Sequence, residues 1–191
     1  MKKSLHYKQV FDLEHDLVQS IWVKGGYKNG KKIYFCHAYR EHSSIMGDSI
    51  NSQKDYLNIL LGQWEAATTD KFPTEPNELH VSLDMNLDYL KENRLQPTYR
   101  LCSLTRLVQN ICNAENFTQL VREPTRSMYN SVSNSTEISC IDHVYCNARH
   151  KCSPPRVIVS GASDNDIICY IRYSKAQPST YYTEKILQRL Y

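Results

Sequence analysis

Carboxylate, amide, imidazole and hydroxyl side chains gather in four short clusters of this sequence, and each cluster follows a stretch that predicts a β-strand. The clusters occupy residues 38–42, 83–88, 140–145 and 161–166. A strand followed by Asp or Asn is by itself ordinary turn chemistry. Sites in α/β proteins nevertheless lie at strand ends, and carboxylate and carbonyl-type oxygens are the ligands that a hard cation such as Mg²⁺ prefers. The four clusters therefore indicate a candidate cation site.

The elements that would position these clusters alternate between strands and helices. Residues 20–24 and 32–39 are extended runs joined by a segment that contains Asn29-Gly30, a strong hairpin signal because both central residues of such a turn need a positive φ. Apolar side chains recur at helical spacing over residues 52–67 and 101–111. Further strands are expected at residues 78–83, 117–121, 139–145, 156–160 and 167–173. This order predicts an α/β or α+β sheet protein.

The chain has 191 residues, of which 41% are hydrophobic and 23% charged, and this composition suits one folded domain rather than a disordered chain. No apolar run approaches the roughly 18 to 20 residues that a membrane-spanning helix needs, and no secretory signal follows the basic N-terminus. We therefore expect an intracellular protein of the nucleus or cytoplasm, with free thiols and no membrane partner. The net charge of +3 is compatible with binding to nucleic acid without being diagnostic of it.

The order and spacing of the four clusters resemble the endonuclease/exonuclease/phosphatase superfamily, which includes DNase I, exonuclease III and the abasic-site endonucleases. The sequence is most similar to the endonuclease domain of non-LTR (LINE-type) retrotransposons. Residues 119–121, the tripeptide at 124–126 and residues 141–147 are similar to the signature of that subgroup. The resemblance implies a DNase I-like α/β/β/α sandwich over residues 1–174. Residues 175–191 look like the start of the linker that precedes a reverse transcriptase.

The family hydrolyses phosphodiester bonds, which requires a divalent cation, a group that orients the attacking water and donors for the developing charge. By resemblance, Tyr39 contacts the phosphate, Asp84 orients the nucleophile and Asn86 binds the phosphate. Asp142 matches the carboxylate that supports the catalytic histidine, and Arg126 is the residue expected to contact nucleic acid. The resemblance thus implies Mg²⁺ as the cofactor and DNA as the partner.

The sequence departs from the family pattern in three ways. The terminal Ser-Asp-His motif is Ser163-Asp164-Asn165 here, so Asp164 matches the metal-side aspartate while Asn165 stands where the catalytic histidine is expected. Asparagine can donate a hydrogen bond but cannot transfer a proton near neutral pH. Leu83 replaces the glycine that usually precedes the first aspartate. The opening strands of the family, with a metal-binding glutamate, have no counterpart, so a partial sandwich without its first strands is expected.

Two functional interpretations follow from the resemblance. The chain is either a Mg²⁺-dependent endonuclease of retroelement origin whose activity is impaired, or a catalytically inactive remnant with at most weak binding to nucleic acid. Loss of the opening strands would leave sheet edges unpaired, so we also expect low stability or self-association through an exposed edge.

Two other arrangements of histidine and cysteine remain open. The composition of a zinc knuckle occurs at His143, Cys146, His150 and Cys152, although their spacing does not match two ligand pairs separated by a long loop. His42 and His80 are possible substitutes for the missing catalytic base. Because His80 lies some four residues before Asp84 on the same expected strand, its side chain should lie at the wrong end of that strand, and a core or surface role is favoured.

Overall fold

The computed structural model describes the chain over residues 7–26, 30–41, 50–69, 77–90, 101–114, 116–159 and 166–173. Its largest element is a six-stranded mixed sheet with the strand order β1-β2-β3-β4-β8-β5. Strands β3 and β4 run parallel, and the other neighbouring strands of this sheet are antiparallel. The strands of this sheet are β1 Lys8–Gln9, β2 Gln19–Gly26, β3 Lys32–Tyr39, β4 Glu78–Asp84, β5 Thr118–Gln119 and β8 Asp142–Cys146.

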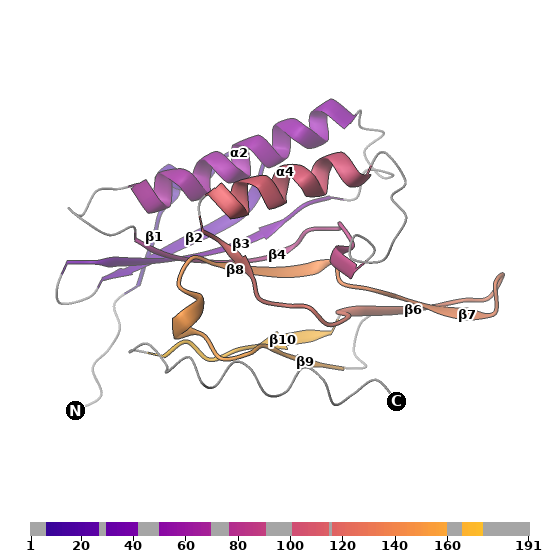
Figure 1. Ribbon diagram of the computed structural model, residues 1–191. Coiled ribbons are helices and arrows are strands. Elements are labelled where there is room, and N and C mark those ends of the chain that lie inside the picture. Colours follow the sequence, from indigo (N-terminus) through magenta and orange to yellow (C-terminus); the bar gives the residue numbers. More distant parts are fainter. Residues whose placement is uncertain are drawn as a thin grey trace.

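Two helices, α2 (Ile50–Thr69) and α4 (Leu101–Ala114), cover one face of the six-stranded sheet (Figure 1). Both helices carry an apolar stripe at helical spacing, and alternate residues of each strand point toward it. The core between the helices and the sheet includes Leu57, Leu60 and Trp64 of α2 and Leu79, Val81 and Leu83 of β4, all of them buried. The remaining strand residues of β4 therefore face away from the helices.

A small antiparallel sheet of β9 (Arg156–Ile158) and β10 (Ile167–Cys169) lies on the other face of the six-stranded sheet (Figure 1). A second apolar core includes Leu120, Val121, Cys140, Val144, Cys146, Ala148 and Cys152, with Val157 and Ile168 packed against it. The described residues thus form a helix layer, a large sheet and a small sheet. This is the mixed α/β class that the alternation of elements predicted.

A hairpin of β6 (Arg126–Asn130) and β7 (Ser135–Ser139) projects from the body of the molecule (Figure 1). The sequence analysis did not expect it, and the single strand predicted over residues 139–145 is confirmed only from Asp142 onward, as β8, because residues 140 and 141 separate it from β7. The chain is interrupted at Cys140 and Ile141 because their backbone N–H groups donate to side chains, to Asp88 Oδ1 at 3.0 Å and Thr125 Oγ1 at 3.2 Å, rather than to a neighbouring strand. The chain therefore leaves the hairpin at β7 and enters the six-stranded sheet as β8.

The other predicted elements are confirmed with changes at their ends. The first hairpin pairs β2 with β3 as expected, and both predicted helices are present. The strands predicted at residues 117–121, 156–160 and 167–173 are shorter than expected. Two short 3₁₀ helices were not predicted, η1 (Phe11–Leu13) and η2 (Arg149–Lys151). The tail over residues 175–191 lies outside the described residues, and among the described helices none has the length and apolarity needed to cross a bilayer.

Candidate functional site

Tyr39, Asp84 and Asp142 form one row across three adjacent strands. The parallel register of β3 and β4 pairs Tyr39 with Asp84, and the antiparallel register of β4 and β8 pairs Asp84 with Asp142. Side chains directly opposite in register share one face of a sheet. Because Ala38 and Leu83 point to the helix-side core, the row faces the other side, toward the small sheet. The structure therefore brings these predicted site residues together at one end of the sheet.

Asn86 lies in the turn that follows β4, in the left-handed region with a φ of 50°. Asparagine adopts this conformation more readily than most residues because its short side chain can hydrogen-bond locally. The Asn86 N–H donates to Asp84 Oδ1 at 3.2 Å, and its side-chain Nδ2 donates to the Arg40 carbonyl at 2.7 Å. Asn86 thus ties the turn after β4 to the end of β3, beside the row.

The Arg40 side chain is buried beneath the row, with only 4% of its surface exposed. Its Nε donates to the Met85 carbonyl at 2.6 Å, its Nη2 donates to the Asn86 carbonyl at 3.2 Å, and its Nη1 contacts Gln53 of α2. Burial lowers the pKa of this guanidinium, and the Asp84 carboxylate partly opposes that shift. Sequence analysis placed Arg40 in a polar cluster but did not identify its role, because no sequence signal distinguishes a buried arginine from an exposed one at a strand end.

Thr125 is fully buried and holds the chain where β8 begins. Its hydroxyl oxygen accepts the backbone N–H groups of Ile141 at 3.2 Å and Asp142 at 3.1 Å. Its carbonyl accepts the N–H of Asp166 at 2.8 Å. Asp164 and Asn165 lie outside the described residues, so their placement is not part of this geometry. Asp166, the first described residue after them, is anchored to the same threonine that positions Asp142.

Arg126 follows Thr125 and is the first residue of β6, where it pairs in register with Ser139. Its side chain is half-buried, and its Nη2 lies 3.9 Å from the Met128 sulfur. Arg126 therefore lies at the base of the projecting hairpin, one residue from the threonine that contacts the start of β8.

The donor set of the row fits a hard divalent cation. Asp84 and Asp142 are register partners on antiparallel strands, and like charges directly opposite in such a pair destabilise a sheet. A cation held at these carboxylates would offset that repulsion. The oxygen ligands that Mg²⁺ prefers are carboxylates, amide carbonyls and water, and the row and Asn86 supply the first two.

Two of the described histidines considered at the sequence level, His80 and His143, lie away from the row. His80 is buried four residues before Asp84, as expected for a core role, and borders a cavity of about 180 Å³ that also includes His37 and Ser82 but no residue of the row. His143 contacts the Tyr145 hydroxyl at 2.9 Å and the Leu87 carbonyl at 3.0 Å. His42 lies outside the described residues.

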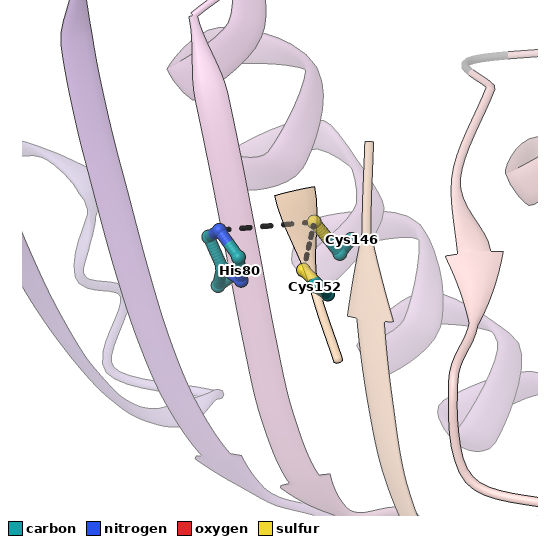
Figure 2. Close-up of side chains that lie close together, drawn as sticks. All are labelled: His80, Cys146 and Cys152. Carbon is teal, nitrogen blue, oxygen red and sulfur yellow. Dashed lines mark hydrogen bonds between the residues drawn. The ribbon is translucent and has the colours of Figure 1, made fainter. Parts of the chain in front are cut away.

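The zinc-knuckle ligand set is wrong. In β8 the side chains alternate between faces, so His143 packs beside Tyr145 while Cys146 belongs to the core facing the small sheet. Cys146 and Cys152 do lie together, but the histidine beside them is His80 of β4 (Figure 2). Sequence spacing could not identify this histidine, since it lies far from both cysteines in the chain.

No protein-family model matches the chain, and no curated protein matches it either. Among solved structures, the endonuclease domain of TRAS1, a telomere-specific non-LTR retrotransposon, is similar with a TM-score of 0.61 and 16% identity, over 92% of this chain and 72% of that one. The human Nocturnin catalytic domain with bound sulfate has a TM-score of 0.45 and 13% identity, over 86% of this chain and 59% of that one. A mannosyl-6-phosphatase of Bacteroides thetaiotaomicron has a TM-score of 0.44 and 12% identity, over 80% of this chain and 56% of that one.

The similarity to the TRAS1 domain covers nearly all of this chain. At 16% sequence identity, this structural similarity shows the fold alone. The described residues of this chain place two helices on one face of the large sheet and a small sheet on the other. The chain therefore has a DNase I-like fold, shared with the TRAS1 endonuclease domain.

Proposed function

We propose that this chain is a retroelement-derived endonuclease-like domain that binds DNA at the row of Tyr39, Asp84 and Asp142 and hydrolyses phosphodiester bonds slowly in the presence of Mg²⁺. The observation that carries the proposal is the register of β3, β4 and β8, which gathers a hydroxyl and two carboxylates at one end of the sheet. The DNase I-like fold, shared with a retrotransposon endonuclease domain, supports it.

Each residue has a role that its chemistry allows. The Tyr39 side chain is 37% exposed, so its hydroxyl can donate a hydrogen bond to a phosphate oxygen. Asp84 accepts the N–H of Asn86, which restrains its carboxylate for orienting a water molecule. Mg²⁺, held by Asp84, Asp142 and Asp164, would supply positive charge to neutralise the phosphate. Asn86, bound to the Arg40 carbonyl, keeps the turn in place beside the row.

The rate of this reaction is expected to be low because Asn165 replaces the histidine of the family pattern. Amide side chains cannot take up or release a proton near neutral pH. Loss of one general acid or base costs about 10²- to 10⁴-fold in rate. Residual turnover would then depend on positioning by the remaining groups and on the charge of the cation.

The test is nicking of supercoiled plasmid DNA by the full chain in Mg²⁺. We expect slow nicking that Asp84→Asn reduces at least about 100-fold, because the amide keeps the shape but loses the charge. Asp12→Asn, an exposed aspartate in η1, is the matched control and should nick like the parent. Equal nicking by the parent and the Asp84→Asn variant would show that the activity comes from another protein and would refute the assigned site.

The second candidate function is a catalytically inactive domain that only binds nucleic acid, and Asn165 is the observation that favours it. The variant Asn165→His distinguishes the two. Restoration of nicking by about 10²-fold or more supports an intact phosphodiesterase site that lacks one proton-transfer group. If neither the parent nor Asn165→His nicks DNA while both bind it, the chain is a binding domain.

A further inference from the structure

A cluster of metal-ligating side chains lies on the same sheet face as the row but at a different level. Register pairs His80 of β4 with Cys146 of β8, as it pairs Asp84 with Asp142 four residues further along β4. At the usual rise per strand residue, this separates the two levels by roughly 13 Å. Cys152, which follows η2, reaches the same place from the segment after β8 (Figure 2).

Two of the three separations among the ligand atoms match a tetrahedral thiolate site. The Cys146 and Cys152 sulfurs lie 3.7 Å apart, and His80 Nε2 lies 3.7 Å from the Cys146 sulfur (Figure 2). All three ligand atoms lie within 4.8 Å of one another. Zinc–sulfur bonds near 2.3 Å and zinc–nitrogen bonds near 2.0 Å in tetrahedral geometry place two sulfurs about 3.8 Å apart and sulfur about 3.6 Å from nitrogen. Both separations to the Cys146 sulfur fit one ion.

Surrounding groups hold the His80 ring in one orientation. The ring stacks on Phe35, with centroids 5.2 Å apart, and lies nearly parallel to the Tyr170 ring. Its Nδ1 lies 3.1 Å from the Tyr170 hydroxyl oxygen, which can accept a hydrogen bond from Nδ1–H and so favour the tautomer whose Nε2 lone pair is available to a metal. A ligating histidine usually has such a partner on its other nitrogen, because this bond fixes the tautomer and the ring orientation.

A backbone donor lies at the Cys146 sulfur. The Ala148 N–H donates to the Cys146 sulfur at 3.1 Å, a contact that stabilises negative charge on sulfur. Two thiolates would neutralise a divalent ion, so the complete site would add little net charge to the core.

Glu78 lies beside the cluster, where its carboxylate contacts His80 and also pairs with two basic residues. Its carboxylate accepts Lys151 Nζ at 2.8 Å, Arg172 Nε at 2.7 Å and Arg172 Nη2 at 2.9 Å, in addition to His80 Nε2 at 2.9 Å. If a metal displaced the proton of His80 Nε2, this carboxylate would keep both basic partners. Metal binding at His80 would therefore not leave Glu78 as a buried, uncompensated charge.

We propose that His80, Cys146 and Cys152 form a buried site for one thiophilic divalent metal ion of the Zn²⁺ class, with the remaining coordination position taken by a ligand from outside this trio. Soft thiolates with imidazole select zinc over Mg²⁺, which requires oxygen ligands. The site would join β4, β8 and the segment after η2, and so stabilise the contact between the large sheet and the residues that lead to the small one. It does not depend on nuclease activity.

The experiment is titration of the full chain, reduced and freed of metal by a chelator, with Co²⁺. We expect a sulfur-to-cobalt charge-transfer band in the near ultraviolet that saturates at one equivalent and disappears when one equivalent of Zn²⁺ is added. Native mass spectrometry of the same unmutated chain should then show one bound zinc. Because both readouts use the parent protein, they do not depend on the folding of any variant.

Three variants assign the ligands. The double variant Cys146→Ala/Cys152→Ala should lose the band and bind at least about 100-fold more weakly, and His80→Gln should keep a weaker band with at least about tenfold lower affinity. Cys112→Ala, a buried cysteine of α4, is the matched control and should bind like the parent. Asp84→Asn should also bind normally, which separates this site from the proposed nuclease site.

Two results would overturn the proposal. The first is no one-to-one complex with Co²⁺ or Zn²⁺ in the parent protein. The second is a Cys146–Cys152 disulfide in protein purified under reductant, since that bond would remove both thiolates and show that the pair is an oxidised crosslink.

Discussion

His143 shows at the residue scale how burial sets the chemistry of a side chain. The ring is buried, and its Nε2 lies 3.0 Å from the Leu87 carbonyl and 3.1 Å from the Cys140 carbonyl, so this nitrogen carries the proton. Nδ1 then accepts the hydroxyl proton of Tyr145. Burial lowers the pKa of His143 to about 4, which keeps the ring neutral in the folded protein. A neutral histidine in this position serves as a structural link rather than a base.

The depressed pKa of His143 predicts a loss of stability in mild acid. Its folded pKa of about 4 lies below the ordinary value of 6.5, so the unfolded chain binds the proton first as the pH falls. The free energy of unfolding should decline between pH 6.5 and pH 4 by on the order of 3 kcal/mol from this group. Urea denaturation across this range should show a flatter decline for His143→Gln. The free energy of unfolding of His150→Gln, a change at an exposed position, should decline with pH like that of the parent. If the decline in His143→Gln were as steep as in the parent, the lowered pKa of His143 would be contradicted.

Thr125 connects several elements through one side chain and its backbone. Its hydroxyl oxygen accepts the N–H groups of Ile141 and Asp142 at the entry to β8, and its N–H donates to Ser139 at the end of β7. Its carbonyl accepts Asp166 just before β10. At the break between β7 and β8, the Thr125 hydroxyl accepts backbone N–H groups that would otherwise bond to a neighbouring strand. It therefore separates the end of the hairpin from the start of β8.

Thr125→Val removes this acceptor without changing the size of the side chain. Two buried N–H groups then lose their partner, and the free energy of unfolding should fall by about 1–3 kcal/mol. Since one of these groups belongs to Asp142, nicking should fall as well. Thr125→Ser keeps the hydroxyl oxygen and should recover most of both properties. Chemical denaturation and the plasmid assay measure them, and equal stability of the valine and serine variants would argue against the role of the hydroxyl.

At the scale of the whole molecule, Glu78 joins the two sheets. The residue lies on β4 of the large sheet and is 1% exposed, while its partner Lys151 belongs to η2 and Arg172 follows β10. Burial alone would raise the pKa of Glu78, but hydrogen bonds from His80 and Lys151 more than offset it and hold the pKa below its ordinary value of 4.5. The carboxylate therefore stays charged and holds the second layer against the first.

Glu78→Gln removes the charge but keeps the shape of the side chain. Two partly buried cations lose their counterion, and the free energy of unfolding at neutral pH should fall by about 3 kcal/mol. Because the folded pKa is lowered, the stability from this carboxylate is complete above about pH 4.5 and is lost as the pH falls through the lowered value. The difference between parent and variant should therefore shrink in acid. Glu65→Gln, at an exposed position of α2, should unfold like the parent. A stability difference between the parent and Glu78→Gln that grows in acid would contradict the lowered pKa of Glu78.

Local patterns were sufficient for most elements of this fold. Helical spacing of apolar residues predicted α2 and α4, and the Asn29-Gly30 signal with its flanking runs predicted the pairing of β2 with β3. Both are properties of short stretches, so no distant contact was needed to recognise them. The hairpin of β6 and β7 was missed because its strands are largely exposed and carry few apolar residues, which leaves no alternating pattern.

The sequence by itself determined which side chains stand at strand ends, including Tyr39, Asp84 and Asp142, and the motif spacing that resembles a DNase I-like protein. Only the tertiary structure decided the register that aligns them and the long-range contacts of Arg40 and Thr125. It also placed His80 beside two cysteines more than sixty residues away in the chain. Strand register and burial depend on pairing between distant segments, and no local pattern in one strand specifies its partner.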